Sequence, residues 1–317
     1  MKKRNIVVGV LGFSCINCNF NADASGYPNR IFDDYVWSPQ SIKYAFRYYW
    51  HEIKKKQVFV YRERKNGRFV PQTVLERYEQ FFGPVNRKGS SNMSVEALRN
   101  GFRFVDTANF GFVFDDDEIR ANATGVVQIA YAMNKYQYSK VKVLDTASND
   151  PSTNVNGSQF IRNRKPYIDE GHFFSNFVVI PSANLQYERM LSDFGGYSVE
   201  NYLDFKEAAL HAVTYQQTLN RAGANNEFAF IVEFKEKAFQ IPYHLEKFIL
   251  FQKEIGDSFG VIDLIRIFEY LRNFEEMIDH IEVYFNPETT KLQMGEMLQI
   301  PITFYSIKDE IMIPRVV

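Results

Sequence analysis

The sequence predicts an α+β fold whose ordered elements run strand, helix, one or two strands, strand, helix, strand. Short apolar runs alternate with longer stretches whose apolar residues recur at helical spacing. The 317 residues are 45% hydrophobic and 24% charged, as in folded proteins, and the length allows two domains or one core with large insertions. The longest apolar runs, such as Phe173–Ile180, are too short to span a membrane, so no membrane partner is expected.

The first two core elements have clear boundaries. Asn5–Ser14 is short, apolar and rich in Val, which predicts a buried strand. A loop is expected over Cys15–Arg30, because Asn, Asp, Gly and Pro punctuate it. Ser38 is a good N-cap and Pro39 suits the first position of a helix that runs to Ile53. Basic side chains are expected on the outer stripe of this helix: Lys43, Arg47, His51 and Lys54.

The middle of the chain is more irregular. Two apolar stretches, Phe102–Phe114 and Gly125–Met133, are expected as strands joined by an acidic turn at Asp115–Glu118. Asp145–Asn163 is the least apolar stretch of the chain. A long polar segment inside a compact domain is usually functional or mobile.

The last core elements are a strand at His172–Pro181, a helix from Ser198 to about Leu219, and a strand at Phe228–Phe234. The complete order fits the split βαβ, ferredoxin-like plan (βαββαβ) that RNA-recognition domains share. The tail predicts two helices and then two strands: His244–Ile255, Ile262–His280, Glu282–Asn286 and Ile300–Tyr305.

Charge is divided unevenly along the chain. Residues 1–170 contain 25 Lys and Arg against 17 Asp and Glu, a net charge of +8, and residues 171–317 contain 12 against 21, a net charge of −9. This asymmetry is typical of a half that binds a polyanion. It also fits copies that associate through basic and acidic surfaces. A chance imbalance on a solvated surface is the remaining interpretation.

The two cysteines, Cys15 and Cys18, have the C-x-x-C spacing of redox and zinc sites. A structural zinc site needs four ligands, and the sequence has no second such pair. A redox pair would open a helix, but a loop signal follows Cys18. We therefore expect no metal and no cofactor, and the lack of a secretory signal predicts a cytoplasmic protein.

Four segments follow one another in the order of one family's motifs: Asn19–Asp23 with Arg30 (N-P-N-G-D…R), Phe104–Gly111 (I-D-x-x-x-F-G), Thr124–Ile129 (T-G-P-V-Q-F) and Asn163–Phe173 (G-R-K…Y-G-L-Y). In this order they resemble the crRNA-binding backbone subunit of type I CRISPR surveillance complexes (Cascade), a RAMP-superfamily protein. The similarity is greatest to the Csh and Csd subfamilies, type I-B foremost. Phe20, Ala22 and Val126 depart from the family's Pro, Gly and Pro.

The resemblance implies a palm of the RNA-recognition type that carries finger and thumb insertions. It implies a non-catalytic scaffold for antiviral defence, several copies of which stack along the crRNA spacer and present it to target DNA. The partners would be crRNA, target DNA held through it, further copies of the chain and other Cascade subunits. The expected parts are palm at 1–55, 116–141 and 172–240, fingers at 56–115, thumb at 142–171, and a C-terminal extension at 241–317.

A subunit that accepts any guide sequence must bind phosphate and ribose, and must leave the base edges free to pair. For each candidate residue the competing interpretation is a solvated charge or a turn residue. Gly223 would let the backbone approach a phosphate, and its competing interpretation is a helix stop. The candidates are Asn19, Asn21, Arg30, Lys43, Arg47, Lys54, Gln128, Arg162, Arg164, Lys165, Arg221 and Gly223.

Competing function classes stay open. An endoribonuclease that processes crRNA needs a general acid or base, but none of the five histidines (His51, His172, His211, His244 and His280) has an obvious partner in the sequence. A metal-dependent nuclease built on Asp115–Glu118 is disfavoured, because neighbouring side chains point apart. The chain could also slice target RNA with Asp23 or Asp33, or serve as a generic RNA-recognition module. We predict no catalytic residue.

Overall fold

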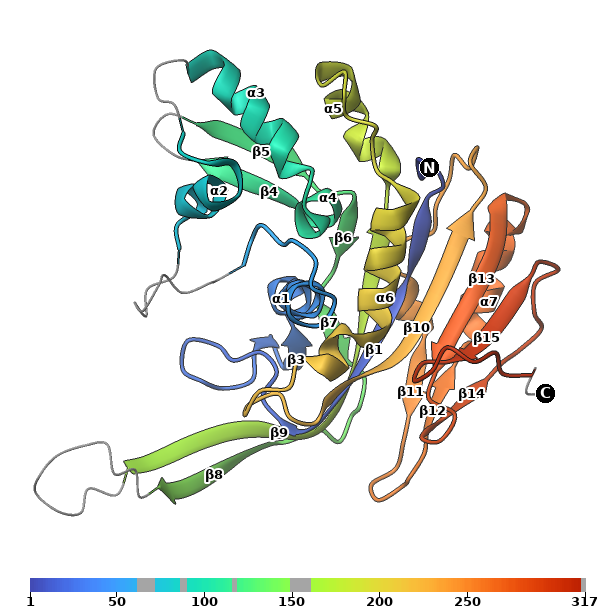
Figure 1. The fold of residues 1–317 in the computed structure, drawn as a ribbon. Coiled ribbons are helices and arrows are strands. Elements are labelled where there is room, and N and C mark those ends of the chain that lie inside the picture. Colours follow the sequence, from blue (N-terminus) through green and yellow to red (C-terminus); the bar gives the residue numbers. More distant parts are fainter. Residues whose placement is uncertain (62–71, 86–89, 116–118, 149–160, 315–317) are drawn as a thin grey trace, which may run out of the picture.

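The computed structural model describes residues 1–317 except 62–71, 86–89, 116–118, 149–160 and 315–317 (Figure 1). Its largest feature is a ten-stranded sheet in which the strands follow the order β15-β13-β10-β1-β9-β7-β3-β2, while β6 and β8 also pair with β9. The strands are β1 (Val7–Cys18), β2 (Arg30–Ile31), β3 (Asp34–Trp37), β6 (Val127–Ile129), β7 (Ala132–Asn134), β8 (Val141–Ser148), β9 (Ile161–Val179), β10 (Ala224–Phe234), β13 (Ile278–Phe285) and β15 (Ile302–Ser306).

Strand β1 is the centre of the sheet. It lies between β9 and β10 and is antiparallel to both. Because strand side chains alternate between faces, Leu11 and Phe13 join one buried cluster, whereas Val8 and Val10 join another. The strand was expected to end at Ser14 but continues through Cys18, so the predicted loop begins four residues later than expected.

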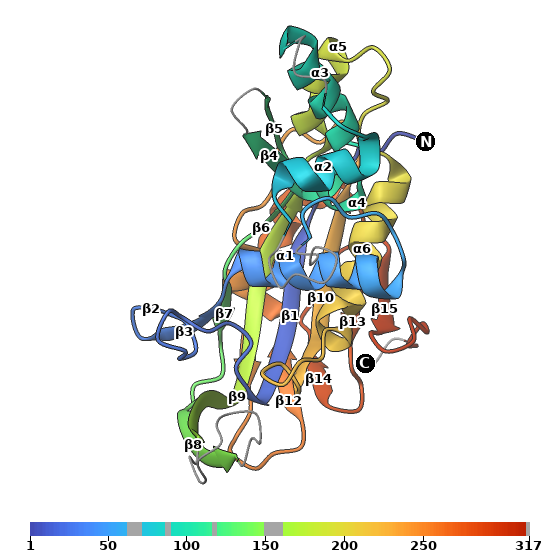
Figure 2. The same ribbon diagram turned by 60° about the vertical axis from the view of Figure 1, so that its left-hand side comes forward.

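Two helices cover one face of this sheet. Helix α1 (Pro39–Tyr48) continues into a π-helical turn at Tyr49–Ile53, and α6 (Val199–Tyr215) packs beside it. Both expected N-caps are confirmed: Ser38 accepts a hydrogen bond from the backbone of Ser41, and Ser198 accepts one from Asn201. Figure 2 shows α1 lying across the strands.

The opposite face is covered by the C-terminal part of the chain. Helix α7 (Ile265–Leu271) packs there with a small sheet in the order β11-β12-β14 (Leu250–Gln252, Gly260–Asp263 and Thr290–Gln293). The two predicted strands of the tail are confirmed as β13 and β15, with shifted ends.

Of the two helices predicted for the tail, the first is wrong and the second is confirmed with shifted ends. His244–Ile255 forms a short 3₁₀ turn and β11, whereas Ile262–His280 contains α7 and a 3₁₀ helix at Arg272–Met277 that follows it. Phe251 is buried and its neighbour Leu250 is more exposed. This is the alternation of a strand, which short apolar runs do not distinguish from a helix.

A third buried cluster forms a separate unit beside α1. It contains α2 (Val74–Phe82), α3 (Ser90–Gly101), the β4–β5 pair (Gly111–Asp115 with Arg120–Thr124) and side chains of α5 (Leu185–Met190). Strand β5 lies beyond residue 115, where the finger insertion was expected to end. The acidic turn expected at 115–118 lies mostly outside the described residues.

Two predicted strands near this unit need correction. The middle of Phe102–Phe114 is helix α4 (Val105–Phe110), and only the end of the stretch, in β4, is a strand. All six residues of α4 are buried, so no amphipathic pattern marks the helix. Gly111, with φ of 75°, ends it. The second predicted strand, Gly125–Met133, is divided between β6 and β7.

A long hairpin projects from the sheet (Figure 1). Strand β8 pairs with the first half of β9, from Val141 opposite Ile168 to Ser148 opposite Ile161. The hairpin contains the described part of the segment expected as the thumb, and residues 149–160 lie outside the description. No helix among the described residues is long and apolar enough to cross a membrane.

Candidate functional site

An open groove of about 1040 Å³ lies between α1, α2 and β4. In Figure 2, α2 lies above α1 on the same side of the sheet. Three residues predicted from the sequence line the groove: Asn21, Arg47 and Arg221. They come from the loop after β1, from α1 and from the loop before β10, so the fold brings together segments far apart in the chain.

A hydrogen-bond network surrounds the start of α1. Ser38 donates to Asn21 Oδ1 at 3.0 Å, and Ser41 donates to the carbonyl oxygen of Phe20 at 3.1 Å. Trp37 Nε1 donates to the hydroxyl of Ser41 at 2.9 Å. The Nδ2 of Asn21 is buried but has no partner among the described residues. An unsatisfied buried donor is costly, so a ligand acceptor that reaches Asn21 would satisfy it.

Arg221 is a buried cation with neutral partners. Its guanidinium donates to Ser41 Oγ and Gln216 Oε1 and lies 5.9 Å from the ring of Trp37. No carboxylate of the described residues pairs with it. Burial lowers the pKa of Arg221 to about 10, which leaves it charged at neutral pH. An unmatched buried charge favours an anionic ligand.

Arg47 is balanced by an acid. Its Nε lies 3.2 Å from Oδ2 of Asp106, a carboxylate that is 0% exposed and also accepts the backbone N–H groups of Phe59 and Val60. Both Arg47 and Lys43 lie over the ring of Phe110, at 5.5 and 5.2 Å. Burial, and then Arg47, lower the pKa of Lys43. These two cations therefore connect α1 to α4.

The basic stripe predicted on α1 divides in two. Lys54 forms an ion pair with Glu207 of α6 and lines a second cavity, of about 680 Å³, away from the groove. His51 packs on the ring of Tyr61, with 4.4 Å between ring centroids. The π-helical turn after Tyr48 changes the angular spacing, so an ideal α-helical wheel misplaces the residues that follow.

The loop after β1 is tied to the hairpin. Asn19 Nδ2 donates to the carbonyl oxygens of Gly26 and Pro166, at 2.9 and 3.0 Å. Asp23 accepts from Ser25, which, with backbone N–H groups, lowers the pKa of Asp23. Its carboxylate therefore stabilises a turn.

Two further predicted contacts already have partners in the protein. Arg30 donates to the hydroxyl of Tyr35 and lies over its ring at 4.3 Å. Gln128 is exposed on β6 and donates to the carbonyl oxygen of Gly125 at 2.9 Å.

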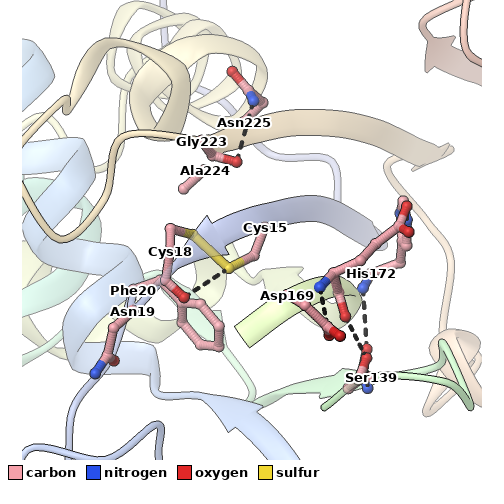
Figure 3. Close-up of a disulfide and its surroundings, with 12 residues drawn as sticks. Cys15, Cys18, Asn19, Phe20, Ser139, Asp169, His172, Gly223, Ala224 and Asn225 are labelled. Atoms are coloured by element: carbon pink, nitrogen blue, oxygen red, sulfur yellow. Dashed lines mark hydrogen bonds and ion pairs between the residues drawn. A yellow bond between two sulfur atoms is a disulfide. The ribbon is translucent and has the colours of Figure 1, made fainter. Parts of the chain in front are cut away.

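Gly223 has a structural reason to be glycine. Its φ is 102°, and a Cβ there would collide with the carbonyl oxygen of Ile16. Its own carbonyl accepts the N–H of Ile16 at 3.0 Å. The close approach is therefore to β1. Cys15 and Cys18 form a disulfide next to this contact (Figure 3), which the sequence interpretation did not anticipate.

The hairpin carries exposed cations. The side chain of Arg164 is 77% exposed, and its Nε lies 3.2 Å from Asp145 Oδ1 on the paired strand. Lys165 is partly exposed. The side chain of Arg162 lies outside the described residues.

The sequence shows no obvious partner for any histidine, but the structure gives His172 two carboxylate partners. Its Nδ1 lies 2.8 Å from Glu227, its Nε2 lies 3.2 Å from Glu170, and its ring stacks on Phe251 at 4.0 Å. Burial opposes the charge, but the two carboxylates outweigh it and raise the pKa of His172 to about 9. Glu227 and Phe251 come from two other strands, so spacing in the sequence could not reveal them. No group of three or more His, Cys, Asp or Glu residues could hold a metal ion in the described part of the chain.

Sequence reasoning also missed groove residues. Tyr44, Tyr61 and Arg77 line the groove with the predicted cations. Basic side chains and aromatic rings thus line one groove of this α+β chain, a combination that single-strand nucleic-acid binders also have.

The comparisons with known proteins identify the family. Residues 5–275 match the family model described as CRISPR-associated protein Cas7, and the chain belongs to this family. No curated protein matches the chain.

Solved structures share the fold. A chain of a "CRISPR RNA-guided surveillance complex, pre-nicking" superposes with a TM-score of 0.55 at 12% identity, covering 92% of this chain and 96% of the other. A chain of a "CRISPR RNA-guided surveillance complex" gives 0.50 at 15% identity, covering 92% and 94%.

Proposed function

We propose that the chain is the crRNA-binding backbone subunit of a type I CRISPR surveillance complex, that it polymerises along the spacer in the cytoplasm, and that it presents the guide to target DNA. The family match over residues 5–275 is the observation that carries this proposal. The solved structures that share the fold are titled as RNA-guided surveillance complexes. The subunit is a scaffold without catalytic activity, and its partners are crRNA, copies of itself and other subunits of the complex. The four sequence segments favour a Csh- or Csd-like chain of type I-B.

We further propose that the central strands form a ferredoxin-like palm. The order β10-β1-β9-β6/β7 supports it, because it places the core strands fourth, first, third and second, all antiparallel, with α1 and α6 on one face. The third buried cluster is the finger unit and the β8–β9 hairpin is the thumb. Residues 241–317 form the extension on the opposite face.

The proposed RNA site has two parts. In the groove, Asn21 and Arg221 bind phosphate or ribose, with Arg47 beside them. On the hairpin, exposed Arg164 and Lys165 bind phosphate. The remaining sequence-predicted contacts are retained as weaker members of the same site, because the structure gives each a partner within the protein or leaves its side chain undescribed: Asn19, Arg30, Lys43, Lys54, Gln128, Arg162 and Gly223.

Co-purification tests the proposal directly. The chain is expressed with its genomic neighbours and a CRISPR array, and bound RNA is extracted and sequenced. We expect RNA of uniform length with repeat-derived ends, and this chain in excess over the other subunits. Random cellular RNA on a monomer would contradict the proposal. A second test is incubation with guide-matched RNA and Mg²⁺, followed on a gel. Intact RNA is expected for a scaffold, and cleaved RNA would show that the chain slices RNA.

A charge deletion tests the hairpin. The double variant Arg164→Ala/Lys165→Ala should bind guide RNA more weakly, with a salt slope lower by at most about one unit per lost phosphate contact. The matched control is Lys235→Ala/Lys237→Ala, two exposed lysines in the turn after β10. Equal affinity and slope in both double variants would remove the hairpin cations from the RNA site.

A further inference from the structure

The groove contains an aromatic pair that the phosphate contacts do not use. Tyr44 of α1 and Tyr61 stack with nearly parallel rings, 6.2 Å between centroids and 5° between planes. Tyr61 is fixed from other sides, because His51 packs on its ring and its hydroxyl donates to Glu52 at 3.0 Å. Tyr44 is thus held as the more exposed ring of the pair, with 39% of its surface accessible.

The anion-binding groups lie beside this ring. Arg221 and Asn21 line the same groove as Tyr44, and the buried Nδ2 of Asn21 has no partner among the described residues. The Tyr44 phenol is near enough to Arg221 to act on its pKa, against the larger effect of burial. Val60 and Val113, 45% and 70% exposed, add apolar surface to the lining. An unmatched cation, a free amide donor and an accessible ring together are suited to a nucleotide.

We propose that Tyr44 is a stacking platform for one unpaired base of the guide RNA in each subunit, and that Arg221 and Asn21 bind the adjoining phosphate. This inference rests on the proposed function. Stacking accepts any base, because every base has a π face. A subunit that must hold variable spacers needs that tolerance. The ring is preorganised by Tyr61, so little rotamer freedom is lost when the base binds.

Photocrosslinking tests the stacking contact. A guide substituted with 5-iodouridine at successive spacer positions is bound to the full chain and irradiated at long wavelength, and crosslinked peptides are identified by mass spectrometry. We expect a crosslink at Tyr44 for one or more positions. We expect none at Tyr243, which is 67% exposed and lies outside the groove. This readout needs no variant, so it does not depend on a mutant that folds.

Affinity gives a second readout. Tyr44→Ala should weaken guide binding by about 5- to 150-fold with an unchanged salt slope, because a stacked base and not a phosphate contact is lost. Tyr44→Phe should bind as the unmodified chain does, and Tyr243→Ala is the matched control. Arg221→Gln should instead lower the salt slope by at most about one unit.

The outcomes separate this inference from the proposed function. Guide RNA bound tightly by the unmodified chain, with no crosslink at Tyr44 and equal affinity in Tyr44→Ala and Tyr44→Phe, would overturn the stacking platform and leave the backbone function standing. A chain that does not bind guide RNA would overturn both. If the ligand of the groove is an acidic peptide in place of RNA, the chain will not bind guide RNA, and both proposals are overturned.

Discussion

Arg47 and Arg221 line one groove, but their charges are balanced in different ways. Arg47 faces the fully buried carboxylate of Asp106, whereas Arg221 has only neutral partners among the described residues. A buried ion pair whose partners satisfy each other contributes to the folded structure itself. A buried cation without an acidic partner stabilises the folded chain less unless an anion is bound to it. Substitutions at Arg221 should therefore affect RNA binding more than substitutions at Arg47, which should affect folding as well.

The carboxylate of Asp106 gives the first stability prediction. Asp106→Asn keeps the shape of the side chain but removes its negative charge. The carboxylate accepts hydrogen bonds from Arg47 and from two backbone N–H groups. We expect the free energy of unfolding to fall by about 3 kcal/mol, measured by urea denaturation. The control is Asp115→Asn, whose side chain is 72% exposed in an ion pair with Arg120, with an expected loss below about 0.5 kcal/mol. Equal losses of unfolding free energy in the two variants would show that the buried ion pair stabilises the fold no more than the exposed one.

A pair of glycines gives the second prediction. Both Gly223 and Gly26 have positive φ, 102° and 86°, but a Cβ meets Ile16 only at Gly223 and open space at Gly26. Gly26→Ala should cost about 1 kcal/mol from backbone strain. Gly223→Ala should cost about 2 kcal/mol more, because the strand contact must also give way. Thermal unfolding of both variants measures the difference. Similar costs would mean that the contact with β1 adjusts freely.

At the scale of elements, His172 joins three strands. It lies on β9, Glu227 lies on β10, and Phe251 lies on β11 of the small C-terminal sheet. Lys253 forms an ion pair with Glu170, which adds a second bond between the C-terminal part and β9. This charged cluster holds the C-terminal sheet against the main one.

The cluster makes stability depend on pH. The pKa of His172 rises from 6.5 to about 9 on folding, so its stabilisation is complete below pH 6.5 and is lost as the pH rises through 9. The amount lost is up to about 3 kcal/mol. The His172→Gln variant should have a lower free energy of unfolding than the unmodified chain at pH 6. It should also lack the decline at higher pH, as measured by urea denaturation at successive pH values. Burial lowers the pKa of Lys135 to about 8. Lys135 titrates in the unmodified chain and in the variant, so its effect on stability cancels when the two are compared. His280→Gln, at an exposed histidine, should keep the decline; a His172→Gln variant that also kept it would refute the assignment.

At the scale of the whole molecule, capped and periodic elements could be predicted from the sequence. The two capped helices are confirmed, and so are the strands at β1, β10, β13, β15 and the second half of β9. Errors fall where burial is uniform or runs are short. Helix α4 is buried on all sides, so its apolar residues show no period. The long polar stretch also concealed the β8–β9 hairpin, whose strands are polar because much of their surface faces solvent.

The groove was only partly predictable for a different reason. Charge and loop composition identified Asn21, Arg47 and Arg221, but nothing local shows that they share one groove. Nothing in the local sequence distinguishes Tyr44 and Tyr61 from core aromatics. Their proposed role depends on the unit formed by α2, α3 and β4 packing beside α1, a long-range event that propensities do not encode.

The division of charge makes a last prediction about assembly. The basic half and the acidic half of the chain would attract each other between neighbouring copies. The screening length falls from about 10 Å at 0.1 M salt to about 3 Å at 1 M, so this attraction should weaken sharply. Without RNA, analytical ultracentrifugation should show a weight-average mass above that of one chain at about 0.1 M salt and the mass of one chain at about 1 M. A mass that is the same at both salt concentrations, whether of monomer or oligomer, would show that complementary charge does not hold the copies together, and contacts on the RNA would then have to order them.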